Sequence, residues 1–507
     1  MKNCLRRNVP PGFKPFLGTN EYKNHKRVII DEVISTNTSK VISDISKLFD
    51  LLKITDGFTL SFHHHLRNGD EVMNMVLSEV KKRGIKNITL AATGIFANND
   101  MIAQLIIDGN ITNIYANYIN GKTGKVISEG YLQGNLIMQT HGGRPRSIEA
   151  GELKIDVAFI ATSIADKFGN GNGLLGKNAC GVLGYTIADM LYAKKKVIVT
   201  DSLVERVEYC QIEAKYIDYC LVVESIGKQS GIVSGTTKIT KDPIGLKIAR
   251  DAAMFIEEAG LINNGFSMQT GAGGTSLAVA SFVKDIMKNN NIKASFASGG
   301  ITSYFVSMLK EGLINNLYDV QCFDLDAVAS AKINENHKII SASKYANPFD
   351  NPIVNNLDFV ILGATEIDLD FNVNVTTSSS GLIMGGSGGH SDTAHGAKLT
   401  IIVSPTMKAR TPIIKDKVTV ITTPGEDVDV LVTERGIAIN PRRVDLIEQF
   451  KNSKLKIVSI KKLLEMTHKY TGIPKNVEFE KRVVGVVEYR DGSIIDSIFQ
   501  VRNNYEL

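Results

Sequence analysis

Residues 378–392 read Ser-Ser-Ser-Gly-Leu-Ile-Met-Gly-Gly-Ser-Gly-Gly-His-Ser-Asp, with five glycines between positions 381 and 389. Glycine buries little surface and costs backbone entropy, so packing does not explain such a run. The glycines let the chain turn tightly and bring bare backbone N–H groups up to a ligand. Such groups bind an anion, for example a phosphate or the oxyanion formed when a carboxylate attacks a thioester. The β-branched run Lys398–Val403 that follows predicts a buried strand, which argues against a flexible surface loop.

The composition is that of an ordinary globular protein. The chain has 507 residues, 43% hydrophobic and 22% charged, which is enough for two to four domains. The net charge of +5 is small and the basic residues are dispersed, which argues against nucleic-acid binding. No apolar run approaches about 20 residues, so we expect no membrane-spanning helix. The basic N-terminus lacks the apolar core of a secretory signal.

The cysteines are few and widely spaced, and they form no metal-ligand pattern. We interpret all of them as buried, reduced side chains, which predicts a cytoplasmic location. They are Cys4, Cys180, Cys210, Cys220 and Cys322.

Short apolar strands alternate with amphipathic helices in both halves of the chain. Ile88–Ala92, for example, lies between helical patterns over residues 70–82 and 100–107. The pattern pauses in the glycine-rich and serine-rich stretch 215–245, and it resumes with a helix that begins at Pro243. Such alternation predicts an α/β fold of two similar domains, each with a mainly parallel sheet flanked by helices. We expect the ligand cleft between them, at the carboxyl ends of the strands.

The predicted boundaries are an N-terminal lead-in over residues 1–35, a first domain over 36–230 and a second over 231–507. Prolines 10, 11 and 15 exclude a long helix in the lead-in. Within the second domain, Val418–Ile421 is also predicted as a strand.

Two polar segments of the first half are candidate ligand sites, and the first of them follows a predicted strand. The first, residues 61–70, contains three consecutive histidines and Arg67. Adjacent side chains on an extended chain point to opposite faces, and no acidic or cysteine partner lies at ligand spacing. We therefore favour hydrogen-bonding or anion-binding histidines over a metal site. The second, Thr140–Arg146, places a histidine, two glycines and two arginines on a turn, which suits carboxylate binding. A solvated basic loop remains the alternative.

Two glycine turns lie beside predicted strands of the second half, and the first is a candidate phosphate-binding loop. Gly271–Gly274 joins a strand to the start of a helix, but it lacks the dinucleotide-binding spacing. Ser298–Gly300 follows another strand. An acidic group, Glu366, Asp368 and Asp370, suits a base or a metal, although a solvated strand end is the more ordinary interpretation.

Several of these segments, in this order, resemble the coenzyme A transferase superfamily. The second half is similar to it in Leu362–Asp368, Met384–Asp392 and Val432–Ala438. Within the superfamily, His63–Asp70, His141–Arg146 and Gly231–Thr237 resemble the citrate lyase alpha-subunit family, which is the citrate CoA-transferase. The resemblance covers nearly the whole chain from about residue 35.

The resemblance implies an exchange of acetyl for citryl on a thioester carried by an acyl carrier subunit. Many CoA transferases use a glutamate nucleophile, and Ser298 occupies that place here. The implied reaction is therefore direct: citrate attacks the acetyl thioester, and the freed thiolate then attacks the mixed anhydride. Such a reaction needs positioning and oxyanion stabilisation more than a protein nucleophile.

The resemblance and the motifs together define three sets of candidate residues. The catalytic candidates are Gly388, Gly389, Ser298 and His64. The citrate-binding candidates are His63, His65, Arg67, Arg144, Arg146, Gly142 and Gly143. The candidates for binding the thioester arm are Gly271, Gly273, Gly274, Gly299, Gly300, Gly385 and Gly386.

The implied partners are the beta (lyase) and gamma (acyl carrier) subunits of citrate lyase together with further copies of this chain, in a multi-subunit complex of citrate fermentation. The implied cofactor is a phosphopantetheine-type arm, derived from CoA and carried by the partner, with no group bound covalently to this chain. The alternatives are a CoA transferase or thioester hydrolase for another acid, using Glu366 or Glu434 as nucleophile, and a non-catalytic scaffold. A sugar-phosphate isomerase fits less well, because such enzymes usually have one domain.

Overall fold

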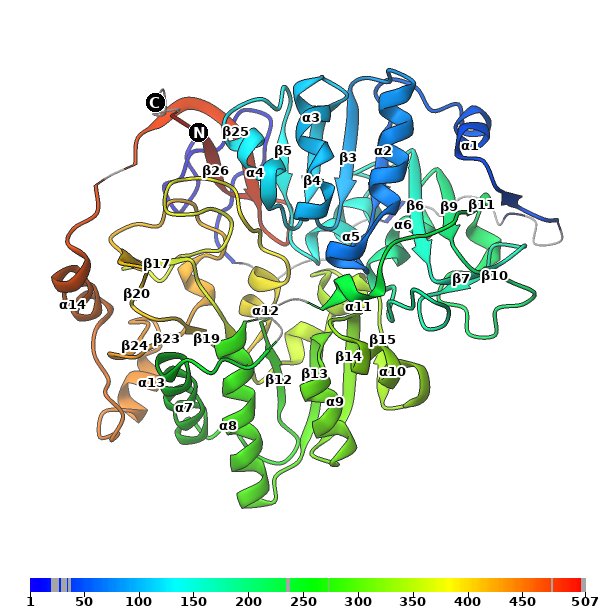
Figure 1. Ribbon diagram of the computed structural model, residues 1–507. Helices are drawn as coiled ribbons and strands as arrows, with labels where there is room; N and C mark the ends of the chain where they lie inside the picture. The colour runs from blue at the N-terminus through cyan, green and yellow to red at the C-terminus, as the bar shows by residue number, and fades with distance from the viewer. Residues whose placement is uncertain are drawn as a thin grey trace.

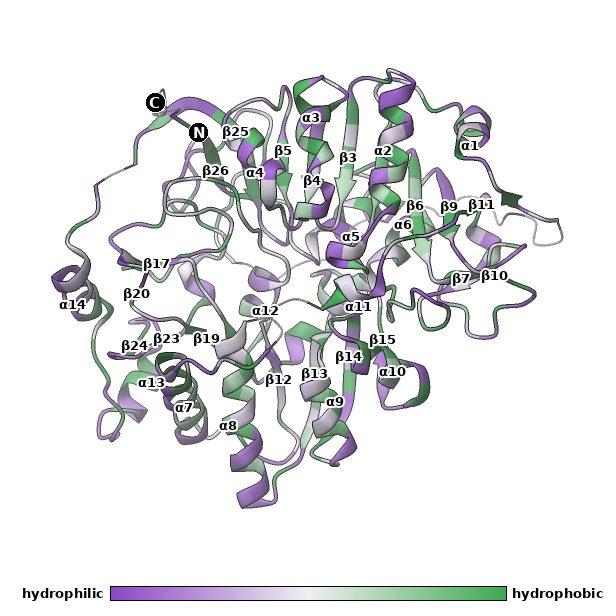
Figure 2. Ribbon diagram, viewed as in Figure 1, coloured by the Kyte–Doolittle hydropathy of each residue, from purple (hydrophilic) through white to green (hydrophobic). Residues whose placement is uncertain are grey.

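The computed structural model describes residues 1–19, 27–28, 34, 38–233, 238–271, 273–475 and 477–502. Two large sheets form the two halves of the molecule, one in the upper and one in the lower part of Figure 1. Helices α5, α11 and α12 lie where the halves meet. Hydrophobic residues concentrate in the strands and on the inward faces of the helices, as the green colouring of Figure 2 shows. The predicted α/β architecture is confirmed.

The first sheet has ten strands, all parallel except for the final antiparallel pair. In spatial order they are β1 (Val41–Ile42), β11 (Tyr219–Val222), β9 (Lys195–Thr200), β6 (Val157–Thr162), β2 (Thr59–Phe62), β3 (Ile88–Ala92), β4 (Ile111–Ala116), β5 (Leu136–Met138), β25 (Phe479–Glu488) and β26 (Ile494–Val501). The helices of this half are α1 (Ile45–Leu52), α2 (Val72–Lys82), α3 (Met101–Ile107), α4 (Gly121–Ser128), α5 (Gly143–Glu149) and α6 (Ile187–Tyr192).

The second sheet has eight strands and likewise ends in one antiparallel pair. Its spatial order is β15 (His337–Ile339), β14 (Ile314–Cys322), β13 (Ala294–Ile301), β12 (Ser267–Thr270), β16 (Phe359–Leu362), β19 (Leu399–Val403), β23 (Val430–Thr433) and β24 (Gly436–Ile439). The helices are α7 (Pro243–Glu258), α8 (Gly274–Asn290), α9 (Ser303–Lys310), α10 (Leu325–Ile333), α11 (Ala342–Ala346), α12 (His390–Gly396), α13 (Val444–Gln449) and α14 (Ile460–Thr471).

The residues of these elements explain where they begin and what they bury. Helix α7 begins at Pro243, where a missing N–H costs nothing, and the Asp242 carboxylate caps it by accepting from the Gly245 amide at 2.9 Å. Strand β19 is buried along its whole length, as its apolar sequence predicts.

The C-terminal hairpin of β25 and β26 belongs to the first sheet, although it lies within the predicted second domain, 231–507. Strand β25 pairs in parallel with β5, placing Val486 opposite Ile137. Residues of the N-terminal lead-in cover the hairpin: Phe16 is fully buried and contacts Tyr489, with ring centroids 4.9 Å apart. The first sheet is therefore completed by the last strands of the chain.

The predicted strand Val418–Ile421 is wrong. Its backbone amides donate to carboxylates instead of to a neighbouring strand: Val418 to Asp368 at 3.3 Å, Thr419 to Glu366 at 2.8 Å and Ile421 to Asp496 at 2.9 Å. Glu366 and Asp368, which are buried in β17 (Glu366–Asp368), therefore do not form a solvated strand end.

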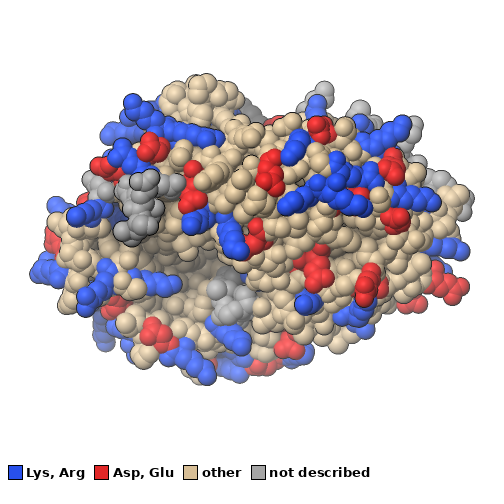
Figure 3. Space-filling model, turned by 45° about the horizontal axis from the view of Figure 1, so that its top comes forward, with Lys and Arg blue, Asp and Glu red and all other residues tan. Residues whose placement is uncertain are grey.

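The prediction of five buried thiols is wrong for Cys4 and Cys210. Both are exposed, whereas Cys180, Cys220 and Cys322 are buried, and all five are free. Cys4 lies in a loop of the lead-in, where no strand covers it. Across the described segments, no helix is long and apolar enough to span a bilayer. On the face shown in Figure 3, basic and acidic side chains are intermingled.

Candidate active site

The candidate site lies between the two sheets, where β2 ends and the histidine segment begins. His63 follows β2 directly, and the short helix Arg67–Gly69 follows the histidines. From the second half, the Gln321 side chain near the end of β14 donates to the His64 carbonyl at 2.9 Å. The carboxyl ends of strands from both sheets therefore meet here, as expected for parallel sheets. We call this region the inter-domain site.

Three histidines and a tyrosine form the centre of the inter-domain site. The Tyr185 ring lies 5.2 Å from His64, 5.9 Å from His65 and 4.6 Å from His141, measured between ring centroids. His64 Nδ1 is 2.6 Å from the Thr93 hydroxyl, which fixes the orientation of that ring. His65 Nε2 and His141 Nδ1 have no hydrogen-bond partner within the described part of the chain.

These histidines are uncharged at neutral pH. Burial lowers the pKa of His64 and His65 well below the ordinary value, and the neighbouring rings lower it further. Burial also lowers the pKa of His141 to about 3. Neutral imidazoles donate and accept hydrogen bonds without repelling a nearby cation. The cluster therefore provides polar contacts but no positive charge.

Arg67 provides the positive charge. Its guanidinium lies 4.7 Å from the centre of the Phe323 ring and 5.9 Å from that of Phe96. Among the residues described, no carboxylate pairs with it, and its Nη1 atom is buried without a partner. Burial lowers the pKa of Arg67, yet arginine stays protonated in proteins. A half-buried, unpaired guanidinium beside neutral hydrogen-bonding groups is suited to a carboxylate ligand.

Arg144, in contrast, already has a carboxylate partner. Its Nη2 lies 3.0 Å from Asp189, which also accepts from the Ser61 hydroxyl and lies 3.0 Å from His63 Nε2. Burial alone would raise the pKa of Asp189, but Arg144 and His63 outweigh it and lower the value to about 2. The Arg144 Nε and Nη1 atoms have no partner among the described residues. One side of this guanidinium is thus neutralised and the other is available.

The remaining candidates of the second polar segment have structural contacts. Arg146 is buried and makes a bidentate pair with Glu152, at 2.9 and 2.8 Å. A Cβ atom on Gly142 would lie 2.0 Å from the Ala346 carbonyl, so only glycine fits there. The Gly143 amide donates to Thr140. Gly142 and Gly143 hold α5 in place, and both terminal nitrogens of Arg146 are taken by Glu152, which leaves only its buried Nε atom without a partner among the described residues.

The glycines around residue 388 contact the same site from the second half. Gly388, with φ +50°, accepts from the His141 amide at 2.7 Å, while its own amide donates to the Asn117 carbonyl. A Cβ atom on Gly389 would lie 2.7 Å from the Tyr345 hydroxyl. The Gly389 amide donates no hydrogen bond within the described part of the chain, whereas the Gly388 amide is already engaged.

Ser298 reaches this region through a chain of hydrogen bonds. The Ser298 hydroxyl donates to Gln269 Oε1 at 2.8 Å, and Gln269 Nε2 donates to the Tyr345 hydroxyl at 2.7 Å. Burial raises the pKa of Tyr345, so the phenol stays protonated and can donate. Asp392 ties the halves together, since its carboxylate accepts from Thr140 and from the Gly142 amide.

The candidates for the thioester arm fall into two groups. Gly271 directly follows β12 and Gly299 lies near the end of β13. A Cβ atom on Gly300 would clash with Phe323, the ring beneath Arg67. Gly273 and Gly274 begin α8. Gly385 and Gly386, however, press against the backbone of Val375 and Asn117, where a Cβ atom would lie about 2 Å from a carbonyl oxygen. Close backbone packing explains that pair.

Sequence reasoning missed Tyr185, Tyr345, Gln269 and Asp189 as site residues. His141 was also not proposed as a site residue, but the sequence did point to it, because it lies in the polar segment Thr140–Arg146. The tyrosines stand in ordinary helical sequence, and nothing in their neighbourhood marks them. The acidic candidates Glu366 and Glu434 instead hold structural partners, Lys415 and the Thr406 amide respectively.

One group outside the inter-domain site has ligand atoms of the kinds that metals bind. Asp319, Cys322 and His337 are buried with these atoms within 4.8 Å of one another. They already satisfy one another: His337 Nε2 is 2.9 Å and Cys322 Sγ 3.1 Å from the Asp319 carboxylate. The geometry is explained by hydrogen bonding alone.

Comparison with known proteins gives a consistent result. The family model for citrate lyase, alpha subunit, matches residues 38–501. The citrate lyase alpha chain of Haemophilus influenzae is 43% identical over 466 residues, covering 92% of this chain and 93% of the relative. That of Klebsiella pneumoniae is 41% identical over 498 residues, covering 98% and 97%.

Solved structures agree. The crystal structure of the alpha subunit of citrate lyase from Streptococcus mutans, in complex with citrate, superposes with a TM-score of 0.94 at 42% identity, covering 99% of this chain and all of that one. A Pseudomonas malonate decarboxylase hetero-tetramer in complex with malonate matches with a TM-score of 0.64 at 13% identity, covering 86% and 84%. The second likeness concerns the fold alone.

Proposed function

The chain belongs to the citrate lyase alpha-subunit family, and we propose that its inter-domain site carries out citrate CoA-transfer by direct exchange. The family supports a transferase that works as a subunit of citrate lyase. The observation that carries the mechanism is the unpaired Arg67 guanidinium beside neutral histidines, with Ser298 where a nucleophilic glutamate would stand.

Citrate binding would use the free charges of the site. Arg67 pairs with one carboxylate, and the free edge of Arg144 is placed for a second. His65 and His141 have ring nitrogens without partners in the described chain, which suit citrate's hydroxyl and remaining oxygens. We do not assign Arg146, because its Nη1 and Nη2 atoms are paired with Glu152 and Glu488 and only its buried Nε atom lacks a partner among the described residues.

The exchange would then proceed in two steps. A citrate carboxylate oxygen attacks the acetyl thioester carbon, the C–S bond breaks, and citryl acetyl anhydride and a thiolate form. The thiolate attacks the citryl carbonyl, the anhydride C–O bond breaks, and acetate leaves with citryl thioester as the product. Each tetrahedral oxyanion would accept hydrogen bonds from the Gly389 amide and the Tyr345 hydroxyl.

The partners follow from the same assignment. We infer a beta lyase subunit and a gamma acyl carrier subunit whose CoA-derived arm brings the thioester to Gly271, Gly299 and Gly300. We also infer a cytoplasmic setting and further copies of this chain in the complex. The free thiols of Cys4 and Cys210 fit a reducing compartment.

An exchange assay on the purified chain tests the mechanism. Acetyl-CoA labelled in the acetyl group serves as a surrogate carrier, citrate as acceptor, and mass spectrometry follows products and intact protein. We expect citryl-CoA and acetate with no adduct on the protein, and an unchanged result in the Glu434→Gln variant. A hydroxylamine-sensitive acyl or CoA adduct on a glutamate would overturn direct exchange, and absence of any product would favour the scaffold.

A further inference from the structure

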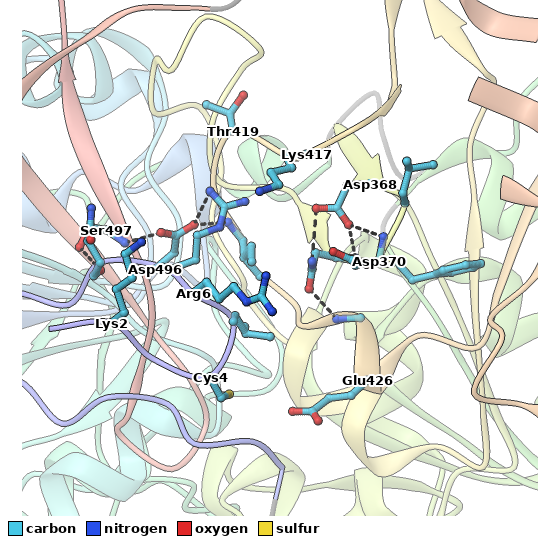
Figure 4. A pocket seen from close by; sticks show the side chains of 18 of the residues that line it. Lys2, Cys4, Arg6, Asp368, Asp370, Lys417, Thr419, Glu426, Asp496 and Ser497 are labelled. Carbon is cyan, nitrogen blue, oxygen red and sulfur yellow. Dashed lines mark hydrogen bonds and ion pairs between the residues drawn. The ribbon is translucent and has the colours of Figure 1, made fainter. Parts of the chain in front are cut away.

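A large cavity lies away from the inter-domain site, between the N-terminal lead-in, the C-terminal hairpin and the outer part of the second half (Figure 4). It has a volume of about 930 Å³. None of the histidines or arginines of the inter-domain site lines it. We call it the N-terminal cavity.

A rigid loop of the lead-in forms one wall. The Asn3 carboxamide oxygen accepts from the amides of Leu5 and Arg7, while its nitrogen donates to the carbonyls of Ile494 and Ile495 in the hairpin. Lys2 pairs with Asn8 across the loop, and Arg6 at its tip has φ +59°. The loop is therefore held in one conformation that presents Lys2, Cys4 and Arg6 to the cavity.

The charges of this cavity are unbalanced once the paired groups are removed. Arg7 pairs with Asp496 at 3.4 Å, Arg442 with Glu426 at 3.5 Å, and Asp368 accepts from backbone amides. Lys2, Arg6 and Lys417 have no side-chain partner among the residues that the structure describes. Among the acids that line the cavity, Asp370 likewise has no side-chain partner in the described part of the chain. Asp368 keeps its charge, because backbone amides do not neutralise a carboxylate. Three cations against two acids, Asp368 and Asp370, therefore leave an excess of one positive charge.

The geometry points to a binding site for an organic phosphate, which we propose for the N-terminal cavity. A phosphate group carries between one and two negative charges at neutral pH and accepts bidentate hydrogen bonds from arginine. Arg6 and Lys417 come from different walls and both line the cavity shown in Figure 4, so a phosphate-bearing ligand there has a cation on either side. Lys2 lies on the same loop as Arg6 and adds the third charge.

The other walls favour a ligand with an apolar body over inorganic phosphate. Phe479 and Phe499 of the hairpin line the cavity and are only partly buried, and the partly buried Leu5 extends this surface. A flat ring that covered them would remove apolar area from water. An aromatic or aliphatic group attached to the phosphate therefore has a place to bind.

Cysteine labelling provides a test that does not depend on enzyme activity. Cys4 lines the cavity and is exposed, Cys210 is exposed elsewhere, and the other three thiols are buried. The full chain is treated with a maleimide, and mass spectrometry gives the labelling rate at each thiol with adenosine diphosphate, pyrophosphate or adenosine present. We expect adenosine diphosphate to slow labelling of Cys4 at least fivefold, without effect on Cys210. Pyrophosphate should protect more weakly, and adenosine not at all.

Variants on the two walls identify the charges involved. Arg6→Ala and Lys417→Ala should each weaken adenosine diphosphate binding about tenfold by calorimetry. The matched control is Lys310→Ala, an exposed lysine at the end of α9, outside the cavity. Since Arg6→Ala could disturb the loop, its Cys4 labelling rate without ligand is compared with that of the wild type. Lys417→Ala tests the opposite wall independently.

Three results would overturn the proposal. The first is unchanged Cys4 labelling at 10 mM adenosine diphosphate, and the second is equal weakening in Lys310→Ala. The third is equal protection by pyrophosphate and adenosine diphosphate, which would show that the organic group of the ligand makes no contribution to binding. Citrate exchange is measured in the same variants: a raised KM for acetyl-CoA would identify the CoA-type thioester as the source of the phosphate, and an unchanged one a free nucleotide.

Discussion

The inter-domain site and the N-terminal cavity both contain several basic side chains. Those of the first are buried and mostly neutralised, whereas the unpaired ones of the second are exposed to solvent. In the inter-domain site, Arg144 is paired with Asp189, the histidines are uncharged, and Arg67 alone keeps an unpaired charge among the described residues. In the N-terminal cavity, Lys2, Arg6 and Lys417 stand in solvent. A buried charge has a high desolvation cost, so each one in the inter-domain site should bind only a matching partner. The exposed charges of the N-terminal cavity are screened by solvent, so their interactions should be weaker and sensitive to salt.

The largest effect is expected from breaking the buried ion pair. Asp189→Asn leaves Arg144 buried without a carboxylate, which should lower the free energy of unfolding by about 3–5 kcal/mol. Urea denaturation measures the change. Asp445→Asn, which breaks the exposed pair with Arg443, should cost less than about 1 kcal/mol. Equal losses in the two variants would refute the contrast between buried and exposed charge.

Removing the single unpaired charge of the inter-domain site should impair binding of citrate. Arg67→Met keeps the length of the side chain but loses the carboxylate contact, so kcat/KM for citrate should fall about 100-fold, mainly through KM. The exchange assay gives both constants. Arg482→Lys, a change at a surface arginine that contacts only backbone carbonyls, is the control. An unchanged KM would show that citrate binds elsewhere.

The neutral state of the buried histidines should appear in the pH dependence of stability. Burial lowers the pKa of His390 to about 4 from 6.5, so between these values the unfolded chain binds a proton that the folded chain does not. Stability should therefore fall as pH drops below 6.5, by about 2 kcal/mol at pH 5 from this residue. Denaturation at pH 7 and pH 5 measures it, and His390→Asn should reduce the difference. A stability that rises on acidification in both proteins would contradict the assignment.

The smallest effect concerns salt. Raising the salt concentration from 50 to 500 mM should weaken adenosine diphosphate binding at the N-terminal cavity about tenfold, because its cations are solvent-exposed. The KM for citrate should change less than about twofold, since Arg67 is half-buried. Calorimetry and the exchange assay give the two values. A citrate KM with the steeper salt dependence would reverse the comparison.

The fold was largely predictable from the sequence, because the apolar composition of strands such as Ile88–Ala92 is enough to predict that they are buried. Val418–Ile421 misled for a physical reason: it is apolar, but buried carboxylates from elsewhere in the chain take its amide hydrogens. The hairpin's place beside β5 also depends on pairing between residues far apart in the sequence.

The site was predictable only as segments. The histidines, Arg67 and the glycines are conspicuous by residue type, and the structure brings His64, Arg67 and Gly388 together with Tyr185 between the sheets. The difference between Arg144 and Arg146 was not visible, because it depends on Asp189 and Glu152 rather than on the arginines themselves. Tyr345 and Gln269 act through tertiary contacts that no local pattern records.

The pairing of β25 with β5 has a consequence for how the chain is made. During synthesis, the first half leaves the ribosome with the β5 edge unpaired until some 340 further residues have followed. An open parallel edge is a template for pairing with other chains, and it persists longest when translation is slow. Truncation between residues 139 and 478 would leave that edge without its partner strand, so we expect premature termination there to yield an aggregation-prone product rather than a stable first domain.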